Sequence, residues 1–386
     1  MKEVFVAADN IVSPLGDTTA ENFTRVAAGE SGITRHADTS LSAAPFYAAM
    51  LHQQQLAEYI AADHLEGHTK FEQLIMLSVK RALAQTDITL ADKRTIFIVS
   101  TTKGNIELLE QQAVGGTPPL ATMQLFNTAQ QLGRHFNAAN APLVVSNACI
   151  SGLLAILTGK RLIDAGLYDH AVITGADVVT QFVLSGFQSF QAVSNAPCRP
   201  FDAARNGVTL GEGAATVILT NDPAHVSGKE RIVLGNGAVS NDANHISGPS
   251  RTGAELSTAM QLAMKGSGLT PYDIGFVSAH GTATLYNDEM EAKALHLAAL
   301  QEVPVNSLKG NYGHTLGAAG LIEAIIGMAC LQQKTVLPTL GFETLGVSMP
   351  VKVSGTLRQK EMRHFLKTVS GFGGCNAAMV FSLSNN

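Results

Sequence analysis

The sequence predicts an α/β protein with mostly parallel sheets, because strand-like and helix-like segments alternate along its 386 residues. Short apolar runs of the length of buried strands recur, and glycine turns and segments with helical spacing lie between them. Hydrophobic residues make up 46% of the chain and charged residues only 15%, so much of the chain must be buried. The 36 glycines are spread along the chain, which indicates many tight turns rather than a flexible tract.

Nine segments have the apolar character of strands. We expect strands at 4–8, 95–100, 143–146, 170–175, 214–219, 231–239, 275–279, 303–307 and 377–383. Between the first two, apolar residues from Phe71 to Leu83 recur at helical spacing, and Thr69 with Glu72 predicts a capping box at the start of that helix. The apolar stretch 317–331 contains Glu323 and is short for a membrane span, so we expect a buried core helix there.

Two short segments echo each other, which indicates a duplicated unit. Residues 211–219 and 374–382 each have a glycine-rich turn, a pair of small residues and then an apolar run. The polar stretch 221–229 is the expected seam between the two halves. We therefore predict an N-terminal half at 1–222 and a C-terminal half at 223–386.

Composition excludes several classes of protein. The formal net charge of −5 argues against general nucleic-acid binding. Four cysteines without a CxxC pair predict neither a disulfide framework nor a zinc ribbon. The first residues lead directly into an apolar run, so we expect no signal peptide and a cytoplasmic location.

Cys149 stands where an apolar strand runs into a turn and then an apolar helix at 150–157. A thiol at the positive end of a helix dipole is expected to have a lowered pKa. His280 and His314 each lie on a turn that contains glycine and follows an apolar strand. One cysteine and two such histidines favour an enzyme that handles acyl thioesters. A zinc site made of the same three residues is the alternative, although no two of them share a short ligand spacing.

Five motifs in a fixed order carry a family resemblance. They are Asn147-Ala148-Cys149, Arg199-Pro200-Phe201-Asp202 with Gly211-Glu212-Gly213-Ala214, His280-Gly281-Thr282-Ala283-Thr284, the segment 309–320, and Gly371-Phe372-Gly373-Gly374-Cys375-Asn376. The chain resembles the β-ketoacyl-acyl-carrier-protein synthases, the condensing enzymes of fatty-acid and polyketide synthesis. The resemblance implies a thiolase-like fold with two pseudo-symmetric halves in five layers, αβαβα, usually paired as a dimer.

The resemblance also implies roles for the catalytic residues. Cys149 is the nucleophile that takes up the acyl chain, and His280 and His314 stabilise the enolate that forms when a malonyl thioester loses carbon dioxide. Lys309 is expected to pair with Glu291 and to orient the histidine centre. The reaction would be a decarboxylative Claisen condensation that gives β-ketoacyl-acyl carrier protein, in fatty-acid or polyketide and polyene synthesis.

Further residues acquire roles from the same resemblance. Thr282 and Thr284 are expected to hold the phosphopantetheine arm of the acyl carrier protein, which brings the substrate, so no separate cofactor is expected. Phe372 is expected to gate the acyl pocket, and its backbone amide with that of Cys149 to form the oxyanion hole. Ser370 and Cys375 depart from the common pattern of the family and leave the natural acyl group open.

The expected partners are the acyl carrier protein and a second subunit, either an identical chain or a chain-length factor. Candidate carrier-docking residues are Lys103, Arg161 and Arg205. Two other functions stay open at this point. A thiolase-like coenzyme A acyltransferase would use Cys375 as a second catalytic cysteine. A non-catalytic chain-length partner would resemble a synthase, but such partners typically lack the cysteine.

Overall fold

A ten-stranded sheet runs through the part of the chain that the computed structural model describes, which is residues 3–113, 115–117, 119–228, 230–242, 244–245 and 248–384. The strand order is β11-β10-β14-β15-β9-β1-β8-β6-β4-β5. The N-terminal strands are β1 (Phe5–Val12), β4 (Thr95–Ser100), β5 (Leu143–Val145), β6 (His170–Asp177) and β8 (Gly213–Thr220). The C-terminal strands are β9 (Ile232–Asn241), β10 (Phe276–Ser278), β11 (Val305–Asn306), β14 (His364–Gly371) and β15 (Cys375–Leu383).

The two sets of five strands have the same topology. In the first set β5, β4 and β6 are parallel, and β8 and β1 follow in antiparallel pairing. In the second set β11, β10 and β14 are parallel, and β15 and β9 follow in antiparallel pairing. The sets meet where Phe5 of β1 pairs with Val233 of β9. The echoing segments 211–219 and 374–382 cover most of β8 and β15, which occupy equivalent positions in the two sets.

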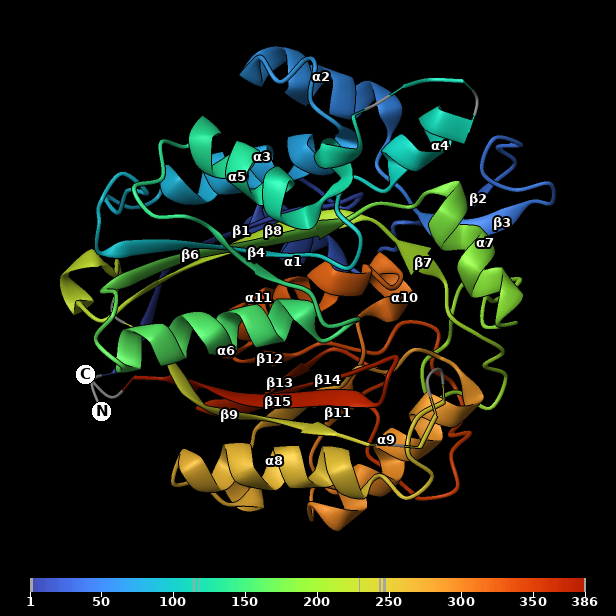
Figure 1. Ribbon diagram of the computed structural model, residues 1–386. Helices are drawn as coiled ribbons and strands as arrows, with labels where there is room; N and C mark the ends of the chain where they lie inside the picture. The colour runs from blue at the N-terminus through green and yellow to red at the C-terminus, as the bar shows by residue number, and fades with distance from the viewer. Residues whose placement is uncertain are drawn as a thin grey trace.

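Helices complete five layers, as Figure 1 shows. Helices α3 (Lys70–Leu83) and α5 (Leu125–His135) cover the outer face of the first set. Helices α8 (Ala254–Gly266) and α9 (Leu285–Leu297) cover the outer face of the second. Helices α6 (Ser151–Asp164) and α11 (Ala319–Gln332) pack together between the two sets. The predicted five-layered thiolase-like architecture is confirmed.

Smaller elements connect these layers. They are α1 (Thr19–Ala27), β2 (Ile33–His36), β3 (Phe46–Ala49), α2 (Gln53–Asp63), α4 (Glu107–Ala113), η1 (Leu120–Met123), α7 (Gln181–Ser189), β7 (Leu210–Gly211), η2 (Pro223–His225), η3 (Pro271–Asp273), α10 (Lys309–Tyr312), η4 (Leu316–Ala318), β12 (Thr335–Val336) and β13 (Arg358–Gln359). The chain passes from the first set of strands to the second between β8 and β9, which is where the predicted seam lies, with residue 229 outside the described residues. The division into domains at 222 and 223 stays a prediction.

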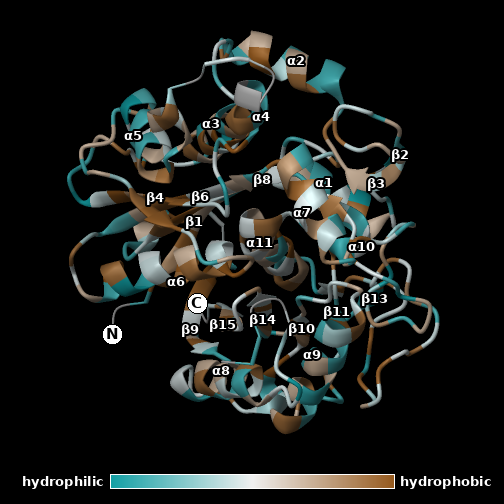
Figure 2. Ribbon diagram, turned by 45° about the vertical axis from the view of Figure 1, so that its right-hand side comes forward, coloured by the Kyte–Doolittle hydropathy of each residue, from teal (hydrophilic) through white to brown (hydrophobic). Residues whose placement is uncertain are grey.

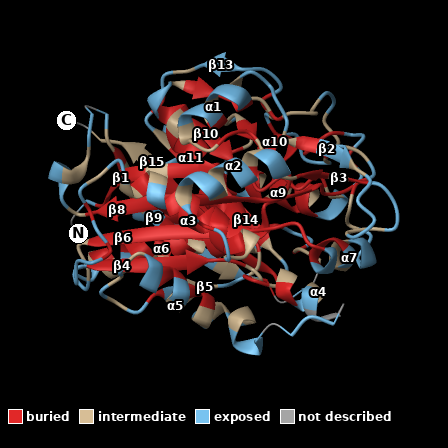
Figure 3. Cartoon of the chain, turned by 90° about the horizontal axis from the view of Figure 1, so that it is seen from above, coloured by how far each residue is buried: buried red, intermediate tan, exposed pale blue. Residues whose placement is uncertain are grey.

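Apolar side chains account for the layering. In Figure 2 the brown colour of apolar residues gathers in the strands, whereas helix α5 carries teal. Figure 3 shows the same strands as buried and the peripheral loops as exposed. The capping box at the start of α3 is confirmed, because Glu72 N–H donates to Thr69 Oγ1 at 3.2 Å and Thr69 N–H donates to Glu72 Oε2 at 3.3 Å. Among the described residues, no helix is long and apolar enough to cross a membrane.

The two central helices touch through their backbones at glycines, and this contact positions the site. A Cβ atom on Gly152 of α6 would lie 2.8 Å from the carbonyl oxygen of Gly317, and one on Gly320 of α11 would lie 2.5 Å from the amide nitrogen of Leu153. Only glycine allows this approach. It brings the turn before α6 against the turn before α11, so segments 165 residues apart in sequence meet.

The nine expected strands are present with shifted ends, whereas β14, the central strand of the second set, is not predicted by the apolar pattern. The reason is Lys367, which interrupts the apolar run 364–371 and is fully buried. A lysine at the middle of a short run normally indicates an exposed segment, because a charged side chain is rarely buried without a partner.

Candidate active site

Cys149 lies on a sharp turn between β5 and α6, as predicted. The residue before it, Ala148, has a φ of 44°, a left-handed conformation that is uncommon for residues other than glycine. The turn is braced by Ser151, whose Oγ accepts a hydrogen bond from Asn147 N–H at 2.8 Å and donates to Ala148 O at 2.6 Å. This strained geometry directs the cysteine to the end of α6, where the helix amides begin.

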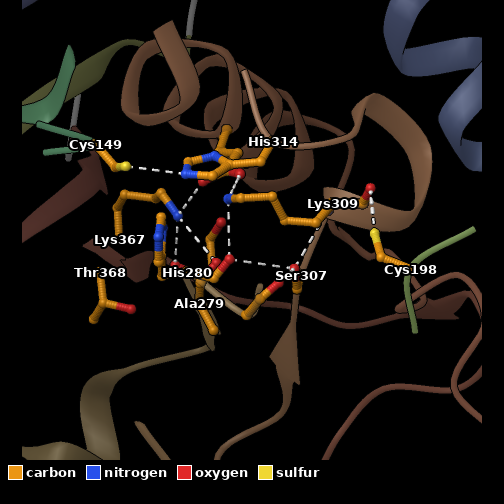
Figure 4. Close-up of polar contacts among 12 residues, drawn as sticks. Cys149, Cys198, Ala279, His280, Ser307, Lys309, His314, Lys367 and Thr368 are labelled. Atoms are coloured by element: carbon orange, nitrogen blue, oxygen red, sulfur yellow. Dashed lines mark hydrogen bonds and ion pairs between the residues drawn. The ribbon is translucent and has the colours of Figure 1, made fainter. Parts of the chain in front are cut away.

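The three predicted catalytic residues meet in one place (Figure 4). Cys149 Sγ lies 3.0 Å from His314 Nε2, and the rings of His280 and His314 are 5.1 Å apart in an edge-to-face arrangement. All three side chains are buried, yet they line a cavity of about 440 Å³. Among the described residues, no group of three or more His, Cys, Asp or Glu side chains is arranged to hold a metal ion.

The expected fall in the pKa of Cys149 is wrong for this enclosed site. Burial raises the pKa of the thiol to about 12, although Lys103 and Lys309 act in the opposite direction. Burial, with the positive charge of Lys309 next in size, also holds the pKa of both His280 and His314 well below the usual value. Burial therefore favours a neutral thiol beside two neutral imidazoles in the resting site.

The expected pairing of Lys309 with Glu291 is also wrong. Lys309 Nζ forms an ion pair with Glu323 of α11 and donates to the carbonyl oxygen of His280 at 3.0 Å. Lys309 and Glu323 are both buried, and Figure 4 shows the lysine side chain extending toward the His280 backbone. The ammonium group thus fixes the backbone of one catalytic histidine, while its own charge is balanced from α11.

Glu291 also contacts the backbone of the His280 turn. Its carboxylate accepts hydrogen bonds from the amides of His280 at 2.7 Å and Gly281 at 2.8 Å, and from Thr368 Oγ1 at 2.9 Å. The carboxylate is fully buried on α9 and reaches the turn after β10. Glu291 therefore contacts the site through backbone amides rather than through a lysine.

The predicted substrate-binding threonines share one wall of the cavity. Both Thr282 and Thr284 line it, and their hydroxyl oxygens lie 2.9 Å apart. The residue between them, Ala283, has a φ of 61°, so the backbone turns there and both hydroxyl groups face the same space. Neither threonine is close in sequence to Cys149, and the fold brings them to one pocket.

Phe372 lines the same cavity beside the nucleophile. A Cβ atom on the preceding Gly371 would lie 2.9 Å from Cys375 Sγ and 3.0 Å from the amide nitrogen of Cys149, so a larger residue there would crowd the turn of the nucleophile. The Phe372 ring stacks on Phe187 at 5.6 Å and meets Phe190 edge-on at 5.6 Å. No sequence motif points to the two phenylalanines around α7, and any rotation of Phe372 must break both ring contacts.

The structure brings two more residues to the site that the sequence does not predict there. In the sequence, Glu323 serves only as a charge that argues against a membrane span, and Lys367 lies in the strand that the apolar pattern does not predict. An isolated acidic residue within an apolar helix was the available signal, because such a residue needs a buried cation. Of the candidate docking residues, Arg205 is buried and donates to Asp202 O at 2.9 Å and Gly346 O at 2.6 Å, so it cannot belong to an exposed docking patch.

Comparisons with known proteins agree with this architecture. The family model described as beta-ketoacyl synthase, N-terminal domain, matches residues 1–225, and the corresponding C-terminal domain matches residues 232–343. The 3-oxoacyl-[acyl-carrier-protein] synthase 2 of Vibrio cholerae is 30% identical over 412 residues, covering 98% of this chain and 99% of the relative.

Two solved structures show the same fold. A beta-ketoacyl synthase from Burkholderia phymatum superposes with a TM-score of 0.88 and 23% identity, over 100% of both chains. The ketosynthase ApeO, solved in complex with its chain length factor ApeC from Xenorhabdus doucetiae, superposes with a TM-score of 0.85 and 22% identity, over 99% of this chain and 98% of that one.

The chain belongs to the β-ketoacyl synthase family. It is a condensing enzyme, a β-ketoacyl-acyl-carrier-protein synthase of fatty-acid or polyketide synthesis.

Proposed function

We propose that the cavity carries out both half-reactions of the condensation, with Cys149 as the acyl acceptor and His280 and His314 as donors to the enolate. The observation that carries this proposal is the contact of 3.0 Å between Cys149 Sγ and His314 Nε2, at a cavity that His280 also lines. A nucleophile within hydrogen-bond reach of a base is the arrangement that acyl transfer to sulfur requires.

In the first half-reaction the thiol attacks the carbonyl carbon of an acyl thioester. Its proton passes to His314 Nε2 as the carbon–sulfur bond forms, because burial disfavours a free thiolate in the resting site. The amides of Cys149 and Phe372 stabilise the tetrahedral oxyanion, and the close approach at Gly371 supports this pairing. The original thioester bond then breaks, and the departing thiol leaves with the proton.

In the second half-reaction a malonyl thioester occupies the same cavity. Its thioester carbonyl accepts hydrogen bonds from the neutral imidazoles of His280 and His314. Loss of carbon dioxide leaves the electron pair on the enolate, which attacks the acyl carbonyl on Cys149. The new carbon–carbon bond forms, the carbon–sulfur bond breaks, and the released Cys149 thiolate takes up a proton from water to return to the neutral thiol. In this proposal both imidazoles are neutral, and they stabilise the negative charge of the enolate through hydrogen bonds alone.

The acyl groups arrive on the phosphopantetheine arm of an acyl carrier protein, so the proposed reaction uses no further cofactor. Support comes from the shared wall of Thr282 and Thr284, which offers two hydroxyl groups along the cavity. The thiolase alternative is less well supported. Cys375 Sγ contacts the carbonyl oxygens of Phe372 at 3.4 Å and Asn147 at 3.8 Å, rather than a catalytic imidazole.

The direct test is to incubate the protein with acyl-loaded and malonyl-loaded carrier protein. We expect an acyl adduct on Cys149 in the intact mass and a β-ketoacyl product on the carrier. Cys149→Ala should form neither, and product from that variant would contradict the assignment. Thr282→Val combined with Thr284→Val should raise the KM for the carrier substrates, whereas Thr258→Val on the exposed side of α8 should not.

We also infer that a second subunit covers the free edge of the sheet at β5. Strand β5 is last in the strand order, and its Leu143 is 39% exposed. Proteins usually protect such an edge, because an unpaired strand with an exposed apolar side chain can pair with another chain. Light scattering should therefore give about twice the mass of one chain, either for the protein alone or for its complex with a co-expressed chain-length factor. Leu143→Glu should shift the mass toward that of one chain. A wild-type monomer under both conditions would exclude this interface.

A further inference from the structure

Lys367 is a buried cation at the catalytic centre that the proposed mechanism has not used. It stands on β14 with its side chain fully buried. Its ammonium group lies 2.7 Å from Glu323 Oε2 and donates to the carbonyl oxygens of Ser278 at 3.0 Å and Ala279 at 3.2 Å. Those two carbonyls directly precede His280, so Lys367 holds the segment that presents the catalytic imidazole (Figure 4).

Lys367 and Lys309 share one carboxylate. Glu323 forms ion pairs with both ammonium groups, and it is itself buried. The other buried carboxylate nearby, Glu291, is occupied by the amides of His280 and Gly281. Both ammonium groups therefore lie beside the imidazoles with Glu323 as their shared ion-pair partner, in an interior where charges interact strongly.

We propose that Lys367 is a positioning residue of the condensation centre, which fixes the His280 turn and keeps His280 and His314 in their neutral, hydrogen-bond-donating forms. From β14 it reaches the carbonyls ahead of His280 and completes the two-lysine arrangement around Glu323. The neutral forms matter because of the proposed function, in which both imidazoles donate to an enolate.

The charged groups around the imidazoles come from several elements. Burial is the largest influence that lowers the pKa of His280, followed by Lys309, His314 and Lys367. For His314 the order is burial, Lys309, Lys103 and Lys367. Burial also lowers the pKa of Lys367, and the charges of Glu323 and Glu291 act in the opposite direction. Removing Lys367 should therefore raise the pKa of both imidazoles.

The test is an NMR titration of protein labelled with ¹³C at the histidine Cε1 position. His280→Asn and His314→Asn assign the two signals. In the wild type we expect both imidazoles to stay neutral well below pH 6.5. In Lys367→Met, a side chain of similar length without charge, at least one should become protonated about one pH unit higher, which corresponds to about a tenfold change in the protonation equilibrium. Lys367→Gln provides a second neutral variant if the methionine variant unfolds.

The matched control is Lys160→Met, which removes another largely buried lysine, paired with Asp164 on α6. It should leave both histidine signals unchanged. Unchanged signals in both Lys367 variants, or an equal shift in the control, would overturn the proposal. The acid limb of the condensation rate should move upward in pH with the NMR shift. If the signals shift but the wild-type protein does not condense malonyl and acyl groups, the proposed function fails while the role of Lys367 in histidine protonation stands.

Discussion

Glu323→Ala is expected to lower the free energy of unfolding by about 3–5 kcal/mol, because it leaves two buried lysines without their carboxylate. Lys309 and Lys367 both pair with Glu323, and none of the three side chains can reach bulk water without opening the core. Urea unfolding followed by circular dichroism measures the change. The urea concentration at the midpoint of unfolding should fall, while the slope of the unfolding free energy against urea concentration should stay the same.

Glu343→Ala is the control for that measurement. Glu343 pairs with Arg199 at 2.7 Å but its side chain is 79% exposed, so the loss should stay below about 1 kcal/mol. The double variant Glu323→Ala with Lys367→Met should recover part of the stability, since one uncompensated charge is removed. A loss in Glu323→Ala no larger than in the control would mean that the lysine pair is not held by this carboxylate.

His280→Ala and His314→Ala are expected to separate the two half-reactions. Without His280 the condensation should slow by about 10²–10³-fold, as for the loss of one donor to a developing oxyanion. Acylation of Cys149 should change little, because the sulfur contacts His314 instead. Without His314 both acylation and condensation should fall. Rates of adduct formation by intact mass and of product formation on the carrier distinguish the two outcomes.

His225→Ala provides a control for general effects of removing an imidazole, since His225 pairs with Asp87 at the surface, away from the cavity. It should leave both rates unchanged. Equal losses of acylation in His280→Ala and His314→Ala would contradict the division of roles between the two histidines.

The local pattern of the sequence was sufficient to predict most of the strands and the turn that carries Cys149. Short apolar runs bounded by glycine indicate buried strands, and the nine strands expected on this basis are present. Strand β14 could not be predicted in this way, because Lys367 can be buried only through its ion pair with Glu323 on another element. A pattern along one segment contains no information about a counter-charge on α11.

The errors at the site have the same origin. The pKa of Cys149 depends on how completely the other half of the chain covers it, and burial outweighs the helix end that the sequence shows. The partner of Lys309 could not be chosen from sequence, since Glu291 and Glu323 are both acidic residues on helices that flank its loop. Only the packing of α11 against α6 decides between them.

The repeated topology has a consequence for how the chemistry is divided between the two halves of the chain. Cys149 follows β5, and Lys309 follows β11, which is the equivalent strand of the other set. The two sets of strands thus place different chemistry at equivalent positions, a thiol after one strand and an ammonium group after the other. A substitution on one strand set can therefore alter acyl uptake while leaving the residues of carbanion formation on the other set in place.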